Sequence, residues 1–511
     1  MSSNSLPSDS LSSSSFLPAD ARNQTEVFAV HGADPEVLAY AMAKYSRSSL
    51  SMRESLTEIS AQRAEQFLNT FYFQYGHRSI ADLAHIAFAV ERLSLLAAIV
   101  LVDEQRWDGQ ERSTRYQNFR KSGWFFPDFG EDSGSARLYA ETAENLFAVY
   151  ERTTAAVFAA LEERIARPDT LKPEAFARTL KARAFDVARY LLPLATNTSL
   201  GQIVNARTLE TQVSRLLSHP AAEIRDLGQK LREAATGAAW NPNPDAPEVR
   251  VAPTLVKYAE ANAYQMQTQA ALAQAAAELL KDVAIAGAPV VDLVERTETL
   301  EIELAATLLY SASHYPYRQV RDFVAALPAA RVAEIIDIGL RHRGRHDEAL
   351  RAFHAGAALR FDILMDIGGF RDMHRHRRVT QIMQGFTAAH GYETPHDGDA
   401  AGLAEAGVLE AYQAAVEGAH AASTRIAAGA APESAQSALY LLPLGTRVRC
   451  LFKMDFAEAQ YISELRSAAA GHFSYRRVAW KMFLALERQH PMLAKYLRVT
   501  DFTRPIDLLQ R

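Results

Sequence analysis

The chain has 511 residues, of which 48% are hydrophobic and 23% are charged, so it can bury large cores and should divide into at least two domains. Its formal net charge of -5 and pI near 6.3 give no global electrostatic attraction for nucleic acid. The single cysteine, Cys450, excludes intramolecular disulfides and thiolate zinc clusters and fits a reducing compartment. We therefore expect a soluble cytoplasmic protein without a nucleic-acid partner.

The N-terminal segment, residues 1–25, is rich in serine and lacks the basic start and apolar core of a secretory signal. We expect it to be a disordered tail. No run approaches the roughly 20 apolar residues that a membrane-spanning helix needs. Even the apolar stretch from Leu93 to Val102 ends at Asp103 and Glu104, so no membrane partner is expected.

Helix is the predicted main element, because apolar residues recur at three-to-four spacing over Pro35 to Lys44, Arg137 to Arg164 and Leu255 to Val283. Prolines forbid a continuous helix within residues 241–253, and a shorter break occurs at residues 286–289. Both breaks are interpreted as linkers.

Several features recur in the same order in the two halves, which indicates an internal duplication. A V-x-x-V strand at residues 27–30, with a helix reaching residue 46, is matched by residues 291–294 and a helix reaching residue 311. Two further pairs are Gly76-His77 with His85 against Arg345-His346 with His354, and the L-L-P-L segments at residues 191–194 and 441–444.

The repeat predicts two α+β units, each with long helices around a small antiparallel sheet. The first unit is placed at residues 26–285, including the proline-rich insert 241–253 and the helix after it. The second, diverged unit is placed at residues 290–511.

One polar segment of the first copy suits an anion. It runs from Glu111 to Tyr116 after an apolar segment predicted to be a long helix. If this segment is extended, the period-two spacing points Glu111, Ser113 and Arg115 the same way. A hydroxyl group combined with a guanidinium suits a phosphate.

A basic segment of the second copy, Arg371 to Arg378, follows a helix predicted over Ala358 to Phe370. So many cations cannot be buried without an anionic partner. Either segment alone is also compatible with a solvated charged helix end. Their occurrence within a repeat favours a shared anion site.

Both copies resemble the flavin-dependent thymidylate synthase family, whose signature is Arg-His-Arg, a short spacer and then Ser-x-Arg. The first copy has Ser113-x-Arg115, but Asp103-Glu104-Gln105 stand in place of Arg-His-Arg. The second copy has Arg375-His376-Arg377, but Gly385 and Thr387 replace the serine and arginine. Each copy keeps the part of the signature that the other has lost.

The downstream part of the family pattern is also divided between the copies. The first copy carries Arg189, Pro193, Asn205, Arg215 and Glu223-Ile224-Arg225. The second keeps Pro443 and Arg466 but has Leu439 for the arginine and Asp455 for the asparagine.

In this family each active site lies between subunits of a homotetramer, so the resemblance implies an intrachain pseudo-dimer and a homodimer of chains that forms a pseudo-tetramer. It implies one composite site per chain, with a dead mirror site. The residues expected to meet there are Glu111, Ser113, Arg115 and Arg189 of the first unit and Arg375, His376, Arg377 and Arg466 of the second.

The activity that the resemblance implies is methylation of dUMP to dTMP, with FAD as cofactor and methylene-tetrahydrofolate and NADPH as co-substrates; NADH instead of NADPH stays open. Arg466 and Arg375 would be catalytic. The nucleotide would be bound by Glu111, Ser113, Arg115, Arg189, Arg375 and Arg466, and the flavin by Arg375, His376, Arg377, His77 and Asn205.

Two alternatives stay open, because Asp372 stands where the family usually has glutamine and a further arginine, Arg378, follows Arg377. One is a flavin- and nucleotide-binding relative with a different reaction or an altered pyrimidine substrate. The other is a non-catalytic helical protein that binds an anion and regulates.

Two other chemistries receive little support from the sequence. Cys450 lies in the alternating stretch Thr446 to Phe452 and is better explained as a strand residue than as a nucleophile. No metal is expected although histidines gather at His342, His346, His354, His374 and His376, because no glutamate lies between them as in H-E-x-x-H and the region is cationic.

Overall fold

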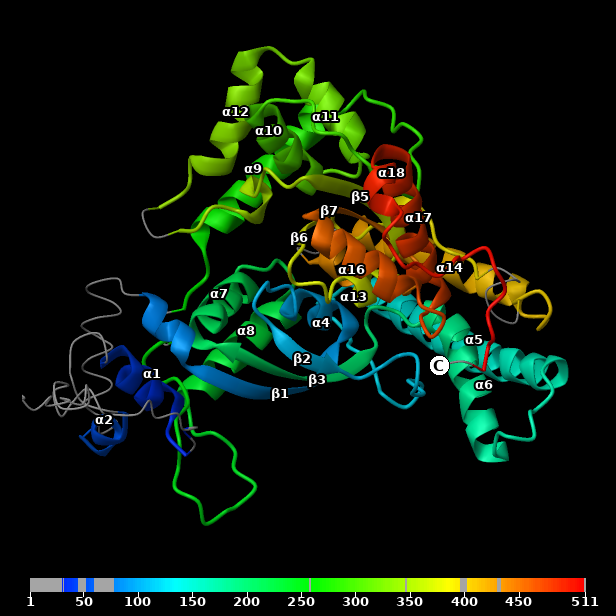
Figure 1. Ribbon diagram of the computed structural model, residues 1–511, viewed down its shortest axis with the longest axis horizontal. Coiled ribbons are helices and arrows are strands. Elements are labelled where there is room, and N and C mark those ends of the chain that lie inside the picture. The colour runs from blue at the N-terminus through cyan, green and yellow to red at the C-terminus, as the bar shows by residue number, and fades with distance from the viewer. Residues whose placement is uncertain are drawn as a thin grey trace, which may run out of the picture.

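The computed structural model describes residues 30, 32–44, 52–58, 78–256, 259–344, 347–395, 402–429 and 433–509. It contains two α+β units that pack against each other (Figure 1). The predicted tail at residues 1–25 and the predicted strand residues 27–29 lie outside the described residues, as do His77, Arg345 and His346.

The first unit has a three-stranded antiparallel sheet in the order β1-β3-β2. Helix α5 is its longest element and, with α6, projects from one end of the unit (Figure 1). Its elements are α1 (Pro35–Lys44), α2 (Met52–Glu58), η4 (Arg78–Leu83), β1 (His85–Ser94), α4 (Leu95–Leu101), β2 (Asp108–Glu111), α5 (Ser133–Arg164), α6 (Pro173–Ala188), η5 (Arg189–Leu191), β3 (Asn197–Asn205), α7 (Ala206–Leu217) and α8 (Ala222–Thr236).

The second unit has a four-stranded antiparallel sheet in the order β4-β5-β7-β6. Its elements are β4 (Val291–Leu293), α10 (Leu300–Ser311), α11 (Tyr317–Ala325), α12 (Ala329–Leu340), η6 (Arg351–Phe353), β5 (Leu359–Asp366), α13 (Ile367–Met373), β6 (Thr380–Met383), η7 (Ala388–His390), α14 (Leu409–Ala427), α15 (Ser434–Leu439), β7 (Arg447–Met454), α16 (Phe456–Ser467), α17 (Phe473–Gln489) and α18 (Pro491–Ala494).

The two units repeat one order of elements: strand, short helix, strand, long helix, helix, strand and two helices. Local capping repeats as well. Ser94 caps α4 by accepting a hydrogen bond from the Ala97 N–H, and Asp366 caps α13 by accepting one from the Gly369 N–H. Corresponding helices of the two units therefore begin with the same kind of side-chain cap, as a duplication predicts.

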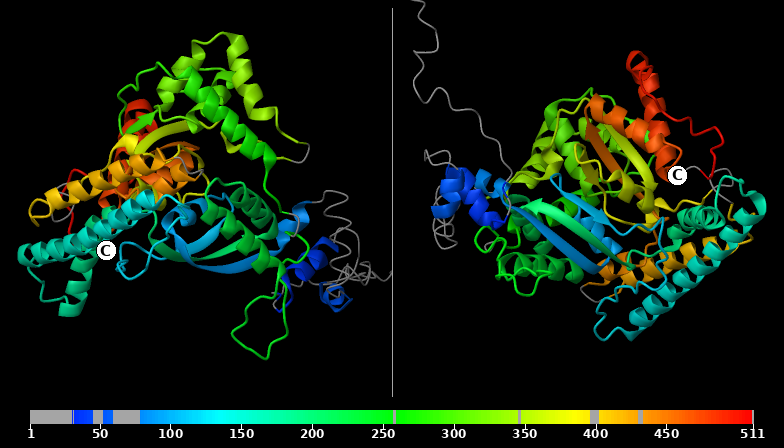
Figure 2. Two further views of the ribbon diagram at one scale, coloured as in Figure 1. Left: turned by 180° about the vertical axis from the view of Figure 1, so that it is seen from behind. Right: turned by 60° about the horizontal axis from the view of Figure 1, so that its bottom comes forward.

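The L-L-P-L segments form the centre of the contact between the units. The Leu194 N–H donates to the Leu442 carbonyl and the Leu444 N–H donates to the Leu192 carbonyl, both at 2.9 Å. These reciprocal bonds surround an antiparallel bridge between Pro193 and Pro443. The long helices α5 and α14 also contact each other and run side by side (Figure 2). The arrangement is the predicted intrachain pseudo-dimer.

One hydrophobic core runs through both units, since buried residues of the two L-L-P-L segments belong to the same cluster. A second cluster lies between α10, α11 and α12 and the second sheet. Because the main core is continuous, the relative position of the units is fixed by packing as well as by hydrogen bonds.

The structure confirms some of the helices and strands predicted from the sequence and contradicts others. The helices over Pro35–Lys44 and Arg137–Arg164 are confirmed by α1 and α5, and the strand at Val291 by β4. Among the described residues from Leu255 to Val283, only α9 (Ala263–Leu279) is helical. It contacts α10 and α12, and these contacts favour counting it with the second unit.

The helix predicted over Ala358–Phe370 is wrong. That segment forms strand β5 (Leu359–Asp366) and only then turns into the short helix α13. Likewise, the apolar residues before Glu111 form strand β1, the seven-residue helix α4 and strand β2 rather than a long helix. Seven of the eight residues of β5 are buried. Its sequence nevertheless alternates apolar and charged residues from Leu359 to Ile363 (L-R-F-D-I), which is a strand pattern that the helix prediction overlooked.

Candidate active site between the two units

Arg115 lies in a turn that follows β2, and its side chain is buried. The strand ends at Glu111, and the Ser113 hydroxyl accepts a hydrogen bond from the Arg115 N–H at 3.2 Å. The chain turns at residues 114–116, so the extended conformation under which Glu111, Ser113 and Arg115 would point the same way is not formed. Glu111 instead forms an ion pair with Arg371 of the second unit.

The Arg115 guanidinium links the two units. Its Nε and Nη2 donate to the two carboxylate oxygens of Asp186 on α6, at 2.8 and 3.2 Å. Its Nη1 donates to the hydroxyl of Tyr475 on α17 at 2.9 Å, and Nη2 also donates to the Ala470 carbonyl at 3.2 Å. A bidentate pair of this kind fixes the orientation of the arginine.

Arg189 follows α6 and begins the short helix η5. Only 2% of it is exposed, and its Nη1 lies 3.4 Å from Oδ2 of Asp372 at the end of α13. Its Nε and Nη2 have no hydrogen-bond partner among the described residues. A buried guanidinium with unused donors can serve an anionic ligand.

Asp372 of the second unit lies at the meeting point of arginines from both units. Burial acts to raise the pKa of its carboxyl group, but Arg189, Arg115, Arg466 and Arg375 together hold that pKa below its usual value. The carboxylate is therefore ionised at neutral pH. Two of the four arginines come from each unit.

Arg466 lies in the last turn of α16, where His376 holds it. Its Nε donates to Nε2 of His376 at 2.9 Å, and its guanidinium carbon lies 5.4 Å from the centre of the Tyr475 ring. Burial, with the charges of Arg466 and Arg377, lowers the pKa of His376 to about 3. The ring is therefore neutral and carries its proton on Nδ1, which lies 3.3 Å from Glu458.

Arg377 connects the basic segment to the first unit. Its Nη1 donates to the Val102 carbonyl at 2.8 Å, and its guanidinium lies 4.8 Å from the centre of the Trp107 ring. Burial, together with Arg375 and Arg351, lowers its pKa to about 10. Arg375 itself is exposed.

Of the eight residues expected to meet, Arg115, Arg189, Arg375 and Arg466 lie around Asp372, and His376 contacts Arg466. Glu111 pairs with Arg371 instead, Ser113 accepts the bond from the Arg115 N–H, and Arg377 contacts Val102 and Trp107 of the first unit. Asn205 does not join this set. Its side chain caps α7 by accepting a hydrogen bond from the Thr208 N–H at 2.8 Å. The next residues of α7, Arg207 and Thr208, line a different cavity.

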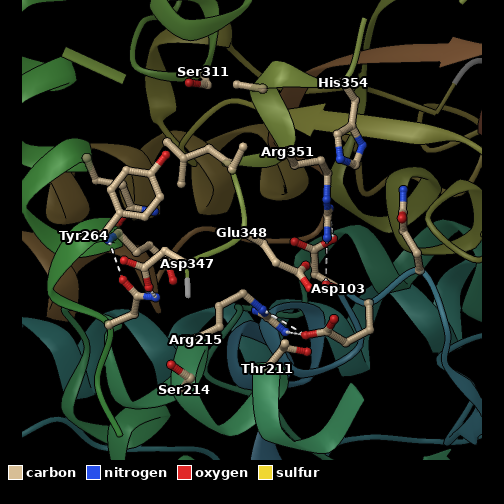
Figure 3. A pocket seen from close by; sticks show the side chains of 18 of the residues that line it. Asp103, Thr211, Ser214, Arg215, Tyr264, Ser311, Asp347, Glu348, Arg351 and His354 are labelled. Atoms are coloured by element: carbon tan, nitrogen blue, oxygen red, sulfur yellow. Dashed lines mark hydrogen bonds and ion pairs between the residues drawn. The ribbon is translucent and has the colours of Figure 1, made fainter. Parts of the chain in front are cut away.

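That cavity occupies the mirror position and has a volume of about 1220 Å³ (Figure 3). Its wall includes Asp103 and Glu104, which replace Arg-His-Arg in the first copy. Arg351 pairs with Asp103 at 2.5 Å, and Arg215 pairs with Glu104 at 2.7 Å. Its other two lining arginines, Arg106 and Arg207, both pair with Asp82.

The electrostatics of this cavity differ from those of the composite site. His374 lies 3.1 Å from Asp103, and although burial acts to raise the pKa of Asp103, Arg351 and His374 hold it far below its usual value. Each lining arginine is already paired with a carboxylate. The mirror position has thus become a set of internal ion pairs, which does not favour phosphate.

Sequence reasoning missed two residues of the composite site, Asp186 and Tyr475. Asp186 lies one helical turn before Arg189, so its proximity to that arginine could have been noticed. Tyr475 has no local signal, because it meets Arg115 across 360 positions of sequence.

Cys450 lies fully buried in β7, which confirms the predicted strand position. Burial raises the pKa of its thiol well above the usual value, so it is poorly suited to be a nucleophile. Within the described residues, histidine, cysteine and carboxylate side chains nowhere gather as three potential metal ligands. None of the helices that the structure describes is long and apolar enough to cross a membrane.

The fold and the site define a duplicated α+β protein with one cluster of arginines shared between its two units. The chain belongs to the family described as Thymidylate synthase complementing protein, whose model matches it twice, at residues 29–239 and 292–492. This confirms the resemblance of both copies.

A UPF0159 protein of Chlamydia pneumoniae is 28% identical over 522 residues, which cover 95% of this chain and 93% of that protein. The flavin-dependent thymidylate synthase of Clostridium tetani is 25% identical over 227 residues, 44% of this chain and 82% of that protein. The flavin dependent thymidylate synthase ThyX of Helicobacter pylori, solved with FAD and dUMP, is 18% identical with a TM-score of 0.27, covering 40% of this chain and 89% of that one.

Proposed function

We propose that this protein uses FAD to methylate dUMP to dTMP, taking the carbon from methylene-tetrahydrofolate and the electrons from NADPH, at the site between its two units. The observation that carries the proposal is the convergence of Arg115 and Arg189 of the first unit with Arg375 and Arg466 of the second. Family membership and the flavin-dependent relatives support the same activity.

Arg189 and Arg115 are the proposed phosphate ligands, with Ser113 beside them. The unused Nε and Nη2 donors of Arg189 would gain acceptors from a phosphate, which repays part of the free energy lost when a guanidinium is buried. The Arg115 side chain is already oriented by Asp186 and Tyr475, so little conformational entropy would be lost on binding. Glu111, held by Arg371, completes the proposed nucleotide set.

Arg466 is the proposed catalytic residue at the uracil ring, with Arg375 beside it. Its Nε is committed to neutral His376, so the guanidinium plane is fixed while its charge is retained. A fixed cation next to a uracil carbonyl would stabilise the negative charge that develops when the ring is activated. His376 acts as a positioning residue for Arg466.

The residues around Arg377 fit the anionic part of FAD. Its pKa is lowered to about 10 because burial and the neighbouring Arg375 and Arg351 disfavour its charge, and a bound pyrophosphate would relieve that repulsion. When bound, the flavin supplies the redox chemistry. Arg375, His376 and Arg377 are the proposed flavin ligands. His77 lies outside the described residues, and Asn205 is already engaged as a helix cap.

The test is the visible spectrum of the purified chain, followed by titration with dUMP. A flavin band that dUMP perturbs, and that is lost in Arg375→Ala, is the expected result. Ser113→Ala, on the opposite unit, should abolish the dUMP response. The matched control is Arg106→Ala, an exposed arginine beside the mirror position, which should leave both signals intact.

Two other outcomes would select the alternatives. A yellow protein that binds dUMP without forming dTMP when methylene-tetrahydrofolate and NADPH are supplied would be a flavin-dependent relative with another reaction. A folded protein that takes up no FAD would contradict the enzyme proposal and leave an anion-binding protein.

A further inference from the structure

Asp372 is an acidic residue that lies among four arginines, Arg115, Arg189, Arg375 and Arg466, whose positive charges would attract an anion. Its carboxylate forms an ion pair with Arg189 at 3.4 Å, and 21% of its side chain is exposed. A second carboxylate of the cluster, Asp186, differs: it makes two bonds to Arg115 and its side chain is 2% exposed. Asp186 orients an arginine, whereas Asp372 is the more exposed of the two carboxylates and makes one longer contact.

The charges around Asp372 can be counted. Arg115, Arg189, Arg375 and Arg466 act on it, and Arg183 lies 4.0 Å from Asp186, which gives five positive charges. The opposing charges are the three carboxylates of Asp186, Asp372 and Asp366, the last of which interacts with Arg189. The nearby His472 is neutral because burial holds its pKa well below its usual value. The cluster therefore has an excess of about two positive charges, which equals the charge of a phosphate monoester near neutral pH.

We propose that Asp372 sets the charge that the nucleotide site accepts, so that the site favours a nucleoside monophosphate and disfavours nucleoside diphosphates. The inference rests on the proposed function, because it assumes that a nucleotide phosphate enters this arginine cluster. With a neutral side chain at position 372, the excess of positive charge in the cluster would rise from about two to about three. Such a cluster suits a ligand that carries more negative charge than a monophosphate.

The size of the effect follows from Coulomb's law. A unit charge about 6 Å from a ligand charge, at an effective dielectric constant of about 40, changes binding about tenfold for each unit of ligand charge. Replacing Asp372 by a neutral residue should therefore strengthen binding of every phosphate ligand. A diphosphate, which carries about one more negative charge, should gain about tenfold more than a monophosphate.

The experiment is isothermal titration of dUMP and dUDP into the full chain and into Asp372→Asn, at fixed low salt. Asparagine keeps the shape of aspartate, and Asp372→Gln is a second variant should the first fold poorly. The expected result is tighter binding of both ligands and a preference for dUMP over dUDP that falls about tenfold. The preference should also fall as salt is added to the wild type.

The sign of the change separates this proposal from a structural role. If Asp372 only positions Arg189, its loss should weaken both ligands equally, and that result would overturn the proposal. Asp226→Asn is the matched control, because it removes an exposed carboxylate of α8 that pairs with Lys230 and should leave the dUMP to dUDP preference unchanged.

The two failures can be told apart. If the wild type binds dUMP but the preference is the same in Asp372→Asn, the inference about Asp372 falls and the proposed function stands. If neither the wild type nor the variant binds dUMP while both are folded, the proposed function is contradicted, and so is the inference about Asp372 that rests on it.

Discussion

Nη1 of Arg189 lies 3.4 Å from Oδ2 of Asp372, although Arg189 belongs to the first unit and Asp372 to the second. The contact joins residues 183 positions apart and brings the two incomplete copies of the site together. Its existence depends on how the units pack, because neither copy contains both residues.

Arg466→Ala is expected to lower kcat for dTMP formation by about a hundredfold, because it removes a fixed cation from the developing charge. The affinity for dUMP should fall much less, since the proposed phosphate ligands Arg115 and Arg189 stay in place. Steady-state kinetics with a separate binding titration checks this. Equal losses in both quantities would instead mean that Arg466 is needed mainly for binding.

Asp186→Ala should destabilise the protein by about 3–5 kcal/mol, because it leaves the buried Arg115 guanidinium without its bidentate partner. Tyr475→Phe removes a single hydrogen bond from the same guanidinium and should cost only about 1 kcal/mol. Urea denaturation of the two variants measures the difference. If both variants lost a similar amount of unfolding free energy, the ion pair between Asp186 and Arg115 would contribute little to stability.

His376→Gln should make stability less dependent on pH. The pKa of His376 is lowered to about 3 in the folded protein against a usual value near 6.5, so the unfolded state binds the proton more strongly. The stabilisation is therefore complete above about pH 6.5 and is lost as pH falls toward 3, with a slope of up to about 1.4 kcal/mol per pH unit.

Urea denaturation between pH 7 and pH 4 tests this, with His219→Gln as the matched control. Burial also lowers the pKa of His219, to about 4, so both variants should flatten the stability profile. Only His376→Gln should also weaken dUMP binding, because only His376 holds Arg466. Unchanged dUMP binding in His376→Gln would contradict its positioning role.

Asp103→Asn tests the mirror cavity. It removes a carboxylate that pairs with Arg351 and contacts His374, so stability should fall by about 3 kcal/mol. The affinity for dUMP should be retained, since the carboxylate of Asp103 pairs with Arg351 and His374 and not with the arginines proposed to bind the nucleotide. Loss of dUMP binding in a folded variant would instead place the nucleotide site in the mirror cavity.

The oligomeric state is a further expectation from the family. Light scattering on a sizing column should give twice the chain mass of 56.5 kDa, because two pseudo-dimers would form a pseudo-tetramer. A monomeric mass would contradict the pseudo-tetramer without affecting the intrachain site.

The sequence by itself determined the duplication and the division of one site signature between its copies, because both are carried by residue identity and order. It also determined the helices α1 and α5, where apolar residues recur at three-to-four spacing. The helix prediction failed at β5, although apolar and charged residues alternate there from Leu359 to Ile363. Only the structure shows that the charged members, Arg360 and Asp362, are buried in ion pairs.

Only the tertiary structure decided which charges meet. The pairing of Arg115 with Asp186, its bond to Tyr475, the place of Asp372 among four arginines and the engagement of Asn205 as a helix cap could not be read from spacing. Side chains hundreds of positions apart approach each other only through the packing of the two units. The burial that follows from this packing sets their pKa values and their capacity to bind.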